Sequence, residues 1–214
     1  MPYFVYGEKE IQHLKAKDSI LGAAIDQIGM VRREVIPDLF QALVNAVIGQ
    51  QISTKAQQTI WTRAKETLSP ITPESIAKRP MEEIQKLGIS MRKAAYIHEA
   101  AEKILRGELD LEALSQEPDE IVCEKLSSLN GIGVWTAEML MTFSMQRPNI
   151  MSFGDLAIHR GLRMLYHHRK IDRNRFEKYR RRYSPYATTA CLYLWAIAGG
   201  AIPELRDLAP KKKK

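Results

Sequence analysis

The sequence predicts an all-α fold. Apolar residues recur every three or four positions along most of the 214 residues, as they do on the buried face of an amphipathic helix. Prolines and small polar residues stand where such helices would begin, and glycines stand where they would end. Only residues 3–6 (YFVY) have the composition of a strand, and no low-complexity linker or repeat of fixed period interrupts the pattern. We therefore expect helices joined by short connections.

Start and stop signals place these helices in order along the chain. Ser53 and Ser90 are predicted N-caps, because a serine hydroxyl accepts a hydrogen bond from the free N–H groups of a first turn. Prolines suit the first helical position, and Gly88 suits a helix end. We expect helices over about 38–52 and 54–68, two short ones opened by Thr72-Pro73 and Arg79-Pro80, then 90–107, 118–128, 134–146, 156–168, 172–183, and a last one from Ser184-Pro185 to Gly199-Gly200.

Composition limits the class of protein. Apolar residues make up 45% of the chain, enough for a sizeable core, yet no apolar run approaches the roughly 18–20 residues that span a bilayer. The first thirty residues carry acids and bases throughout, unlike a signal peptide. Cys123 and Cys191 lie in apolar helical patterns typical of buried reduced thiols, and two cysteines cannot form a four-thiolate site. We expect an intracellular protein with no membrane contact and no metal held by side chains.

The net charge of +7 is unevenly distributed. Residues 167–182 hold eight basic and two acidic residues, and residues 211–214 are all lysine, whereas the remainder is slightly acidic. Such asymmetry is typical of a protein that binds a polyanion, and nucleic acid is the commonest one. A solvated helix face followed by a frayed tail is the alternative interpretation.

The most informative segment, residues 126–139 (LSSLNGIGVWTAEM), joins two predicted helices. Gly131 and Gly133 flank Ile132 in the turn, and glycine both tolerates positive φ and lets the backbone approach a ligand closely. The amide groups from Gly131 to Val134 would lie at the N-terminus of the second helix, where the helix dipole favours a phosphate oxygen. Ile132 would anchor the turn in the core. An ordinary turn between two helices is the alternative.

Asp155 follows Gly133 by 22 positions and opens the next long helix. Taken alone, an aspartate at this position is explained as an N-cap, worth about 1 kcal/mol. The apolar positions of the helix that follows include Leu156, Ile158, Leu162 and Leu165.

The combination of this hairpin with Asp155 resembles the helix-hairpin-helix (HhH-GPD) DNA glycosylase superfamily. Within it, the motifs are most similar to the alkylpurine (3-methyladenine) DNA glycosylase II branch. The resemblance covers about residues 37–200, and residues 47–53 (VIGQQIS) are similar to the family's first core helix and wedge loop.

The resemblance implies a fold of two helical halves that flank a cleft. Residues 1–36 and 150–214 would form one half, in which an N-terminal helix over about 7–28 packs beside the C-terminal helices. Residues 37–149 would form the other, with the helix-hairpin-helix at about 118–146. Because only 36 residues precede the resemblance, we expect no additional N-terminal α/β domain.

The resemblance also implies an activity. A damaged purine such as 3-methyladenine or 7-methylguanine would be flipped out of duplex DNA and its N-glycosidic bond hydrolysed. Asp155 would be the catalytic carboxylate, which stabilises the positive charge on the sugar and orients or deprotonates the attacking water. The expected partner is double-stranded DNA with damaged bases, bound by a monomer that is cytoplasmic and nucleoid-associated. No cofactor and no iron–sulfur cluster is expected, and the resemblance allows only a monovalent cation at the backbone carbonyl groups of the hairpin.

Trp135 stands where bifunctional members of the superfamily carry a lysine that forms an imine. A tryptophan cannot form one, which favours a monofunctional enzyme. Trp135 and Trp195 match aromatic residues of the family's base pocket, where an indole face attracts a cationic base. Met139 takes the place of the pocket tyrosine. The cleft would hold Asp155 with both tryptophans, and simple core packing is the alternative for each tryptophan, as we expect for Trp61 and Tyr193.

Gln51 matches the wedge that fills the gap left by an extruded base. Ile52 could fill the gap instead, and a plain loop glutamine is a third interpretation.

Three alternatives remain for the whole chain: a glycosylase for another lesion (a deaminated or mismatched base), a non-catalytic hairpin module that holds DNA, or an all-α protein with coincidental glycines. Asp155 discriminates between enzyme and module, because a pure binder needs the hairpin amides but no carboxylate.

Overall fold

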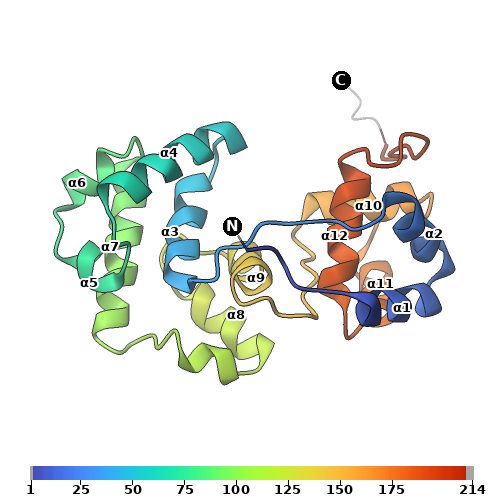
Figure 1. The fold of residues 1–214 in the computed structure, drawn as a ribbon, viewed down its shortest axis with the longest axis horizontal. Helices are drawn as coiled ribbons and strands as arrows, with labels where there is room; N and C mark the ends of the chain where they lie inside the picture. Colours follow the sequence, from blue (N-terminus) through green and yellow to red (C-terminus); the bar gives the residue numbers. More distant parts are fainter. Residues whose placement is uncertain (1, 211–214) are drawn as a thin grey trace. The chain divides into compact units, whose positions relative to one another are not determined.

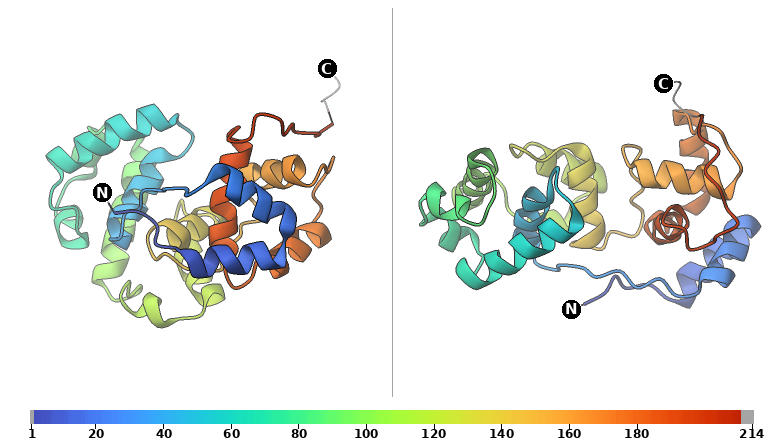
Figure 2. Two further views of the ribbon diagram at one scale, coloured as in Figure 1. Left: turned by 45° about the vertical axis from the view of Figure 1, so that its right-hand side comes forward. Right: turned by 90° about the horizontal axis from the view of Figure 1, so that it is seen from above.

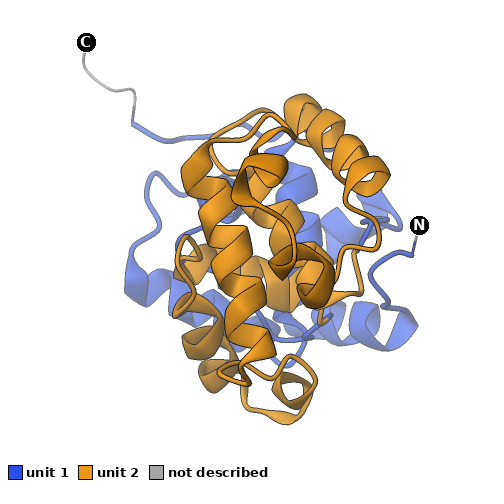
Figure 3. Cartoon of the chain, turned by 90° about the vertical axis from the view of Figure 1, so that its left-hand side faces the viewer, with its two compact units in different colours: residues 1–35, 146–214 blue, residues 36–145 orange. Residues whose placement is uncertain are grey.

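The computed structural model describes residues 2–210, and its regular elements in that range are helices (Figure 1). The all-α prediction is confirmed. The chain divides into two compact units, Met1–Val35 with Gln146–Lys214 (unit 1) and Ile36–Met145 (unit 2) (Figure 3). None of the helices within residues 2–210 is both long and apolar enough to cross a bilayer. The predicted lysine tail at 211–214 lies outside the described residues.

Unit 2 contains α3 to α9, most of which begin where the sequence predicted. Ser53 and Ser90 are confirmed as N-caps, since each side chain accepts a hydrogen bond from the N–H three residues later. The helix expected over 38–52 is shorter, because Gln50 leaves the helical conformation and residues 50–53 form a loop. The helices are α3 (Leu39–Gly49), α4 (Thr54–Thr67), α5 (Pro73–Ala77), α6 (Met81–Gln85), α7 (Met91–Leu105), a 3-10 turn (Ala113–Gln116), α8 (Asp119–Ser127) and α9 (Val134–Phe143).

Helix α3 is the core of unit 2. It packs against α4, α7 and α9 (Figure 2). A helix with neighbours on several sides must be apolar around most of its circumference. Full burial of each large apolar side chain contributes roughly 1.5–3 kcal/mol, and this burial fixes the loop that follows Gly49. The buried residues of α3 are Phe40, Ala42, Leu43, Val44, Val47 and Ile48.

Unit 1 combines helices from both ends of the chain. Helix α12 is its centre, because ten of its twelve residues are buried. It contacts helices from the N-terminal and the C-terminal parts of the sequence, namely α1, α2, α10 and α11. The helices of unit 1 are α1 (Glu8–Lys17), α2 (Ser19–Ile28), α10 (Leu156–Leu165), α11 (Arg173–Tyr183) and α12 (Ala187–Ala198).

The prediction of one N-terminal helix over 7–28 is wrong, because the chain breaks at Asp18. Asp18 has an extended backbone (φ −151°), and its Oδ1 caps α2 by accepting from the N–H of Leu21 at 2.9 Å. Its Oδ2 accepts from the Tyr166 hydroxyl at 2.8 Å and from the Arg182 guanidinium at 2.6 Å. This buried carboxylate therefore ties the α1–α2 corner to α11 and to the end of α10, and burial without such partners would be costly.

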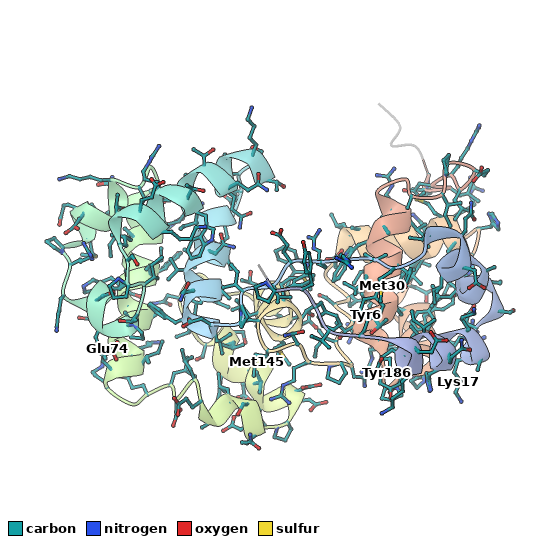
Figure 4. The ribbon with its side chains drawn as sticks, viewed as in Figure 1. Tyr6, Lys17, Met30, Glu74, Met145 and Tyr186 are labelled. Carbon is teal, nitrogen blue, oxygen red and sulfur yellow. The ribbon has the colours of Figure 1, made fainter. Side chains whose placement is uncertain are left out.

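The strand-like residues near the N-terminus pair with a second extended segment without forming a sheet. Tyr3 and Glu34 make a single isolated bridge. The Tyr6 hydroxyl donates to the carbonyl of Val31 at 2.9 Å and accepts from the N–H of the same residue at 2.8 Å. Tyr6, labelled in Figure 4, thus fixes the chain before α1 to the chain after α2. A single bridge does not make a strand, so the strand-like composition of residues 3–6 does not correspond to a strand in the structure.

Helices α10 and α12 pack closely at Gly161. A Cβ atom at this position would lie 2.3 Å from the carbonyl oxygen of Leu194, which is backbone and cannot rotate away. Only glycine permits this approach. The contact sets the position of α10, and therefore of Asp155 at its start.

We predict that Gly161→Ala destabilises unit 1 by about 1–3 kcal/mol or prevents it from folding, because the added methyl group forces the two helices apart. Thermal unfolding followed by circular dichroism measures this. Gly7→Ala is the control, since a methyl group there meets no atom within 4 Å. Equal melting temperatures for the two variants would contradict the role given to the close helix contact.

Candidate nucleic-acid interface and carboxylate site

The predicted helix-hairpin-helix is present as α8, a six-residue turn (128–133) and α9. Leu126, Leu129 and Ile132 are buried, and the N–H of Ile132 donates to the carbonyl of Leu129 at 3.0 Å. Helices α8 and α9 pack on each other. The prediction that Ile132 anchors the turn in the core is confirmed, since only 4% of this residue is exposed.

The two glycines of the turn have different roles. Gly131 has φ +81°, and a Cβ atom there would lie 2.2 Å from the ring of Tyr96 on α7. Gly133 has φ −84°, which any residue adopts, and a Cβ atom there would meet nothing within 4 Å. Positive φ, which glycine tolerates, therefore occurs at Gly131 and not at Gly133. What glycine provides at position 133 is bare backbone beside open space.

Gly133 is also the N-cap of α9. Because it has no side chain, no side chain of the N-cap residue bonds to the N–H groups of the first turn. The two residues that follow have exposed side chains, Val134 at 58% and Trp135 at 49%. The start of α9 therefore presents backbone, an aliphatic group and an indole at the surface of unit 2, and the N-terminus of a helix favours anions.

The residues predicted to line a base pocket belong to two helices. Trp135 and Met139 are one turn apart on α9, where residues four apart share a face. Core packing does not explain Trp135, because half of it is exposed. Trp195 is partly buried on α12, one residue after the Leu194 that contacts Gly161.

The proposed wedge residues lie in the loop between α3 and α4, and both are exposed. Gln51 has a left-handed backbone (φ +58°), which is uncommon for a residue other than glycine. The preceding residue, Gln50, donates from its side-chain Nε2 to the carbonyl oxygen of Gly131 at 2.7 Å. The structure thus brings the wedge loop and the hairpin turn together. The sequence did not single out Gln50, since no local pattern reveals a partner 81 residues away.

Asp155 lies at the head of α10 with only 6% of its surface exposed. Its Oδ1 accepts hydrogen bonds from the N–H groups of Ala157 at 2.8 Å and Ile158 at 2.9 Å. The predicted N-cap is confirmed, and these two bonds hold the carboxylate in one orientation.

The prediction for Leu156, the next residue, is wrong. It was expected on the apolar face of α10, but it is 83% exposed. At 100° per residue, Leu156 lies on the opposite side of α10 from the buried Ile158, Leu162 and Leu165, so the helical period itself places it away from the core. The result is an apolar side chain in solvent directly beside a buried carboxylate.

Aromatic side chains brace the chain before Asp155. The Nε2–H of His159 donates to the carbonyl of Phe153, with 2.8 Å between the two atoms, because a carbonyl can only accept. The imidazole also lies edge-on to the Phe153 ring and stacks on Phe176 of α11. The Arg173 guanidinium lies 4.7 Å from the centre of the Phe153 ring. Sequence reasoning missed His159, which sits one helical turn after Asp155.

No group of three His, Cys, Asp or Glu side chains within residues 2–210 is arranged to hold a metal ion. Cys191 is buried as predicted, whereas Cys123 is only partly buried.

The site residues are divided between the units. Asp155 and Trp195 belong to unit 1, and the hairpin, Trp135, Met139 and the wedge loop belong to unit 2.

We predict that Gly131→Ala lowers the melting temperature clearly, while Gly133→Ala changes it little. The first variant combines positive φ with a collision against Tyr96, and the second meets neither obstacle. Thermal denaturation of both purified variants against the parent protein measures the difference. A Gly133→Ala variant that is the less stable of the two would contradict this account of the turn.

We also predict that His159 makes stability fall as the solution is acidified. Burial, the largest influence, lowers the pKa of His159 below its usual value. The unfolded chain then takes up the proton first as the pH drops through about 6.5, so the free energy of unfolding decreases below that pH. Melting temperatures between pH 8 and pH 5 should fall more steeply for the parent protein than for His159→Gln. A steeper fall in the variant would contradict the prediction.

Comparison with known proteins agrees with this geometry. A model of the HhH-GPD superfamily of base excision DNA repair proteins matches residues 44–185. DNA-3-methyladenine glycosylase 1 of Schizosaccharomyces pombe is 33% identical over 178 residues, which are 81% of this chain and 78% of that protein.

Solved structures are similar over nearly the whole chain. The crystal structure of DNA-3-methyladenine glycosidase from Bacillus halodurans has a TM-score of 0.84 and 36% identity, and the match covers 97% of both chains. The 3-methyladenine DNA glycosylase of Schizosaccharomyces pombe in complex with abasic DNA has a TM-score of 0.78 and 28% identity, covering 90% of this chain and 97% of that one. With the hairpin and Asp155 both inside the matched residues, the chain belongs to the HhH-GPD superfamily of base excision DNA repair proteins.

Proposed function

We propose that this protein is a monofunctional DNA glycosylase that removes alkylated purines, such as 3-methyladenine and 7-methylguanine, from double-stranded DNA. The observation that carries the proposal is Asp155, a carboxylate held in one orientation by two backbone N–H groups in a chain of this family. Relatives named DNA-3-methyladenine glycosylase support the choice of substrate.

Asp155 supplies the charge that the reaction needs. When the bond between C1′ and the purine nitrogen breaks, the base leaves with the bonding electrons and positive charge develops on the sugar. A fixed carboxylate stabilises that charge without having to reorganise. Water then adds to C1′, and Asp155 orients the water and accepts its proton. Alkylation of the purine eases the reaction, because a cationic base departs as a neutral molecule.

The hairpin holds the DNA backbone. The N–H groups at the start of α9 face an unobstructed approach past Gly133, and a phosphate oxygen is the ligand that a helix N-terminus favours. Such a contact positions the strand and reads no base. The hairpin therefore binds DNA of any sequence, and the base pocket provides the choice of lesion.

Three side chains are proposed to contact the flipped base, namely Trp135 and Met139 of unit 2 and Trp195 of unit 1. The exposed indole of Trp135, together with Trp195, presents π faces to a cationic purine, an interaction of about 0.5–2 kcal/mol. Met139 adds a polarisable surface beside Trp135. Because Trp135 carries no amine, the enzyme forms no imine with the sugar and leaves the abasic strand uncut.

The loop after α3 fills the space that the extruded base leaves. Gln51 is both exposed and polar, so it can occupy the gap and hydrogen-bond to the orphaned partner base. Ile52 adds apolar contact with the neighbouring bases.

Hydrolysis consumes only water, so the proposed reaction needs no cofactor. One chain supplies every group named above, and the proposed enzyme acts as a monomer.

We predict that Asp155→Asn lowers the single-turnover rate of base release by about a hundredfold or more, since the anion that stabilises the sugar cation is lost. Folding should survive because asparagine caps a helix about as well as aspartate. The substrate is a duplex with one 7-methylguanine, and the abasic product is revealed by alkaline cleavage. Without alkali, the strand should stay intact for the parent protein.

Asp172→Asn is the matched control. Asp172 caps α11 in the same unit through a hydrogen bond from the N–H of Arg175, so this variant makes the same chemical change at a helix start. It should keep the parent rate. An Asp155→Asn variant with full activity would refute the catalytic role, and cleavage of the strand without alkali would refute the monofunctional assignment.

A further inference from the structure

The wedge loop is fastened from two sides. The Gln50 side chain donates to the carbonyl of Gly131 in the hairpin turn at 2.7 Å. The Gln50 backbone carbonyl accepts from the Lys93 ammonium, also at 2.7 Å, and the same ammonium donates to the carbonyl of Ile48 at 2.8 Å. Gln50 thus joins the end of α3, the hairpin and α7 immediately before Gln51.

Helix α7 touches the hairpin as well. The Tyr96 ring packs against Gly131. The carboxylate of Glu99 accepts from the side-chain amide of Asn130 at 2.7 Å. Lys93, Tyr96 and Glu99 follow one another at intervals of three along α7, so neighbouring members lie side by side on its surface. One helix therefore supports the hairpin turn and the wedge loop together.

The contact of Lys93 is unusual for a lysine. Within residues 2–210 its ammonium pairs with two neutral carbonyl groups and with no carboxylate. Burial lowers the pKa of Lys93, which indicates that the charged form loses hydration there. A positive charge at the C-terminus of α3 is favoured by the helix dipole. It also holds the two carbonyl groups from which the chain turns into the left-handed conformation of Gln51.

We propose that Gln50 and Lys93 are positioning residues that fix the wedge loop relative to the hairpin turn, so that a strand anchored at the hairpin places the gap left by its extruded base at Gln51. The inference rests on the proposed function. Neither residue touches the reacting atoms. They hold Gln51 in position before the base pair opens. The ordering of Gln51 therefore adds no entropic cost to the opening of the pair.

The two residues should therefore matter most when a base pair must be opened. A 7-methylguanine that faces cytosine has to be unpaired, and its partner is then left without hydrogen bonds. The same lesion facing a tetrahydrofuran abasic analogue has no partner to lose and leaves no orphaned base. A defect that is merely structural would lower the excision rate equally on both duplexes.

The experiment measures single-turnover excision on these two duplexes. Gln50→Glu keeps the size of the side chain but sets a carboxylate against the carbonyl of Gly131, and Lys93→Met keeps most of the length but removes the ammonium. Each variant should lower the rate by about tenfold or more on the cytosine-facing lesion and by less than about threefold on the abasic-facing lesion. If Lys93→Met does not fold, Gln50→Glu gives the same comparison.

Lys103→Met is the matched control, because it removes the same charge from the last turn of the same helix, whereas the hydrogen bonds to the loop and the hairpin are made by Lys93 and Glu99. It should leave both rates near the parent values. Variants that slow both duplexes equally, or slow neither, would overturn the inference while the parent activity upholds the proposed function. A parent protein inactive on both duplexes would overturn the proposed function and this inference with it.

Discussion

The N–H groups of a first helical turn have no partners inside the helix, and the proposed chemistry depends on how two helices of this chain meet that constraint. At α10 the Asp155 carboxylate satisfies them, and in return they fix its orientation. At α9 the N-cap is Gly133, whose missing side chain leaves room for an external anion. The unpaired N–H groups of a first turn thus orient the Asp155 carboxylate at the start of α10. At the start of α9, in the proposed function, they bind a phosphate of the DNA.

Both helix starts need rigid support, and glycines provide part of it through contact rather than flexibility. Gly161 lets α10 lie directly on the backbone of α12, and Gly131 lets the hairpin turn lie directly on the ring of Tyr96. In each case the missing side chain brings two elements closer than any other residue would allow. Close packing of this kind resists small displacements, and charge stabilisation loses much of its effect when a group moves by an ångström.

The all-α class, most helix starts, the hairpin and Asp155 were predictable because their signals are local or contiguous in the sequence. The break at Asp18 has a local signal that was missed, an aspartate that caps α2, whereas its partners Tyr166 and Arg182 are 148 and 164 residues away and could not be predicted. The hydrogen bond from Gln50 to the hairpin could not be predicted either, because its two residues are also far apart in the sequence. The exposure of Leu156 had another cause: it was grouped with the apolar positions of its helix, although the helical period places it opposite Ile158, Leu162 and Leu165.

Because unit 1 takes its helices from both ends of the chain, synthesis on the ribosome completes the two units in a definite order. Helices α1 and α2 emerge first, yet their partners α11 and α12 emerge last. All of unit 2 is made in the interval and can fold before its neighbour is complete. Through that interval the apolar side chains of Leu14, Leu21 and Ile25 lack their final cover. The nascent chain therefore exposes these side chains, which are buried in the finished unit, until α11 and α12 have been made, and this is the interval in which a chaperone that holds unfolded chains would bind them.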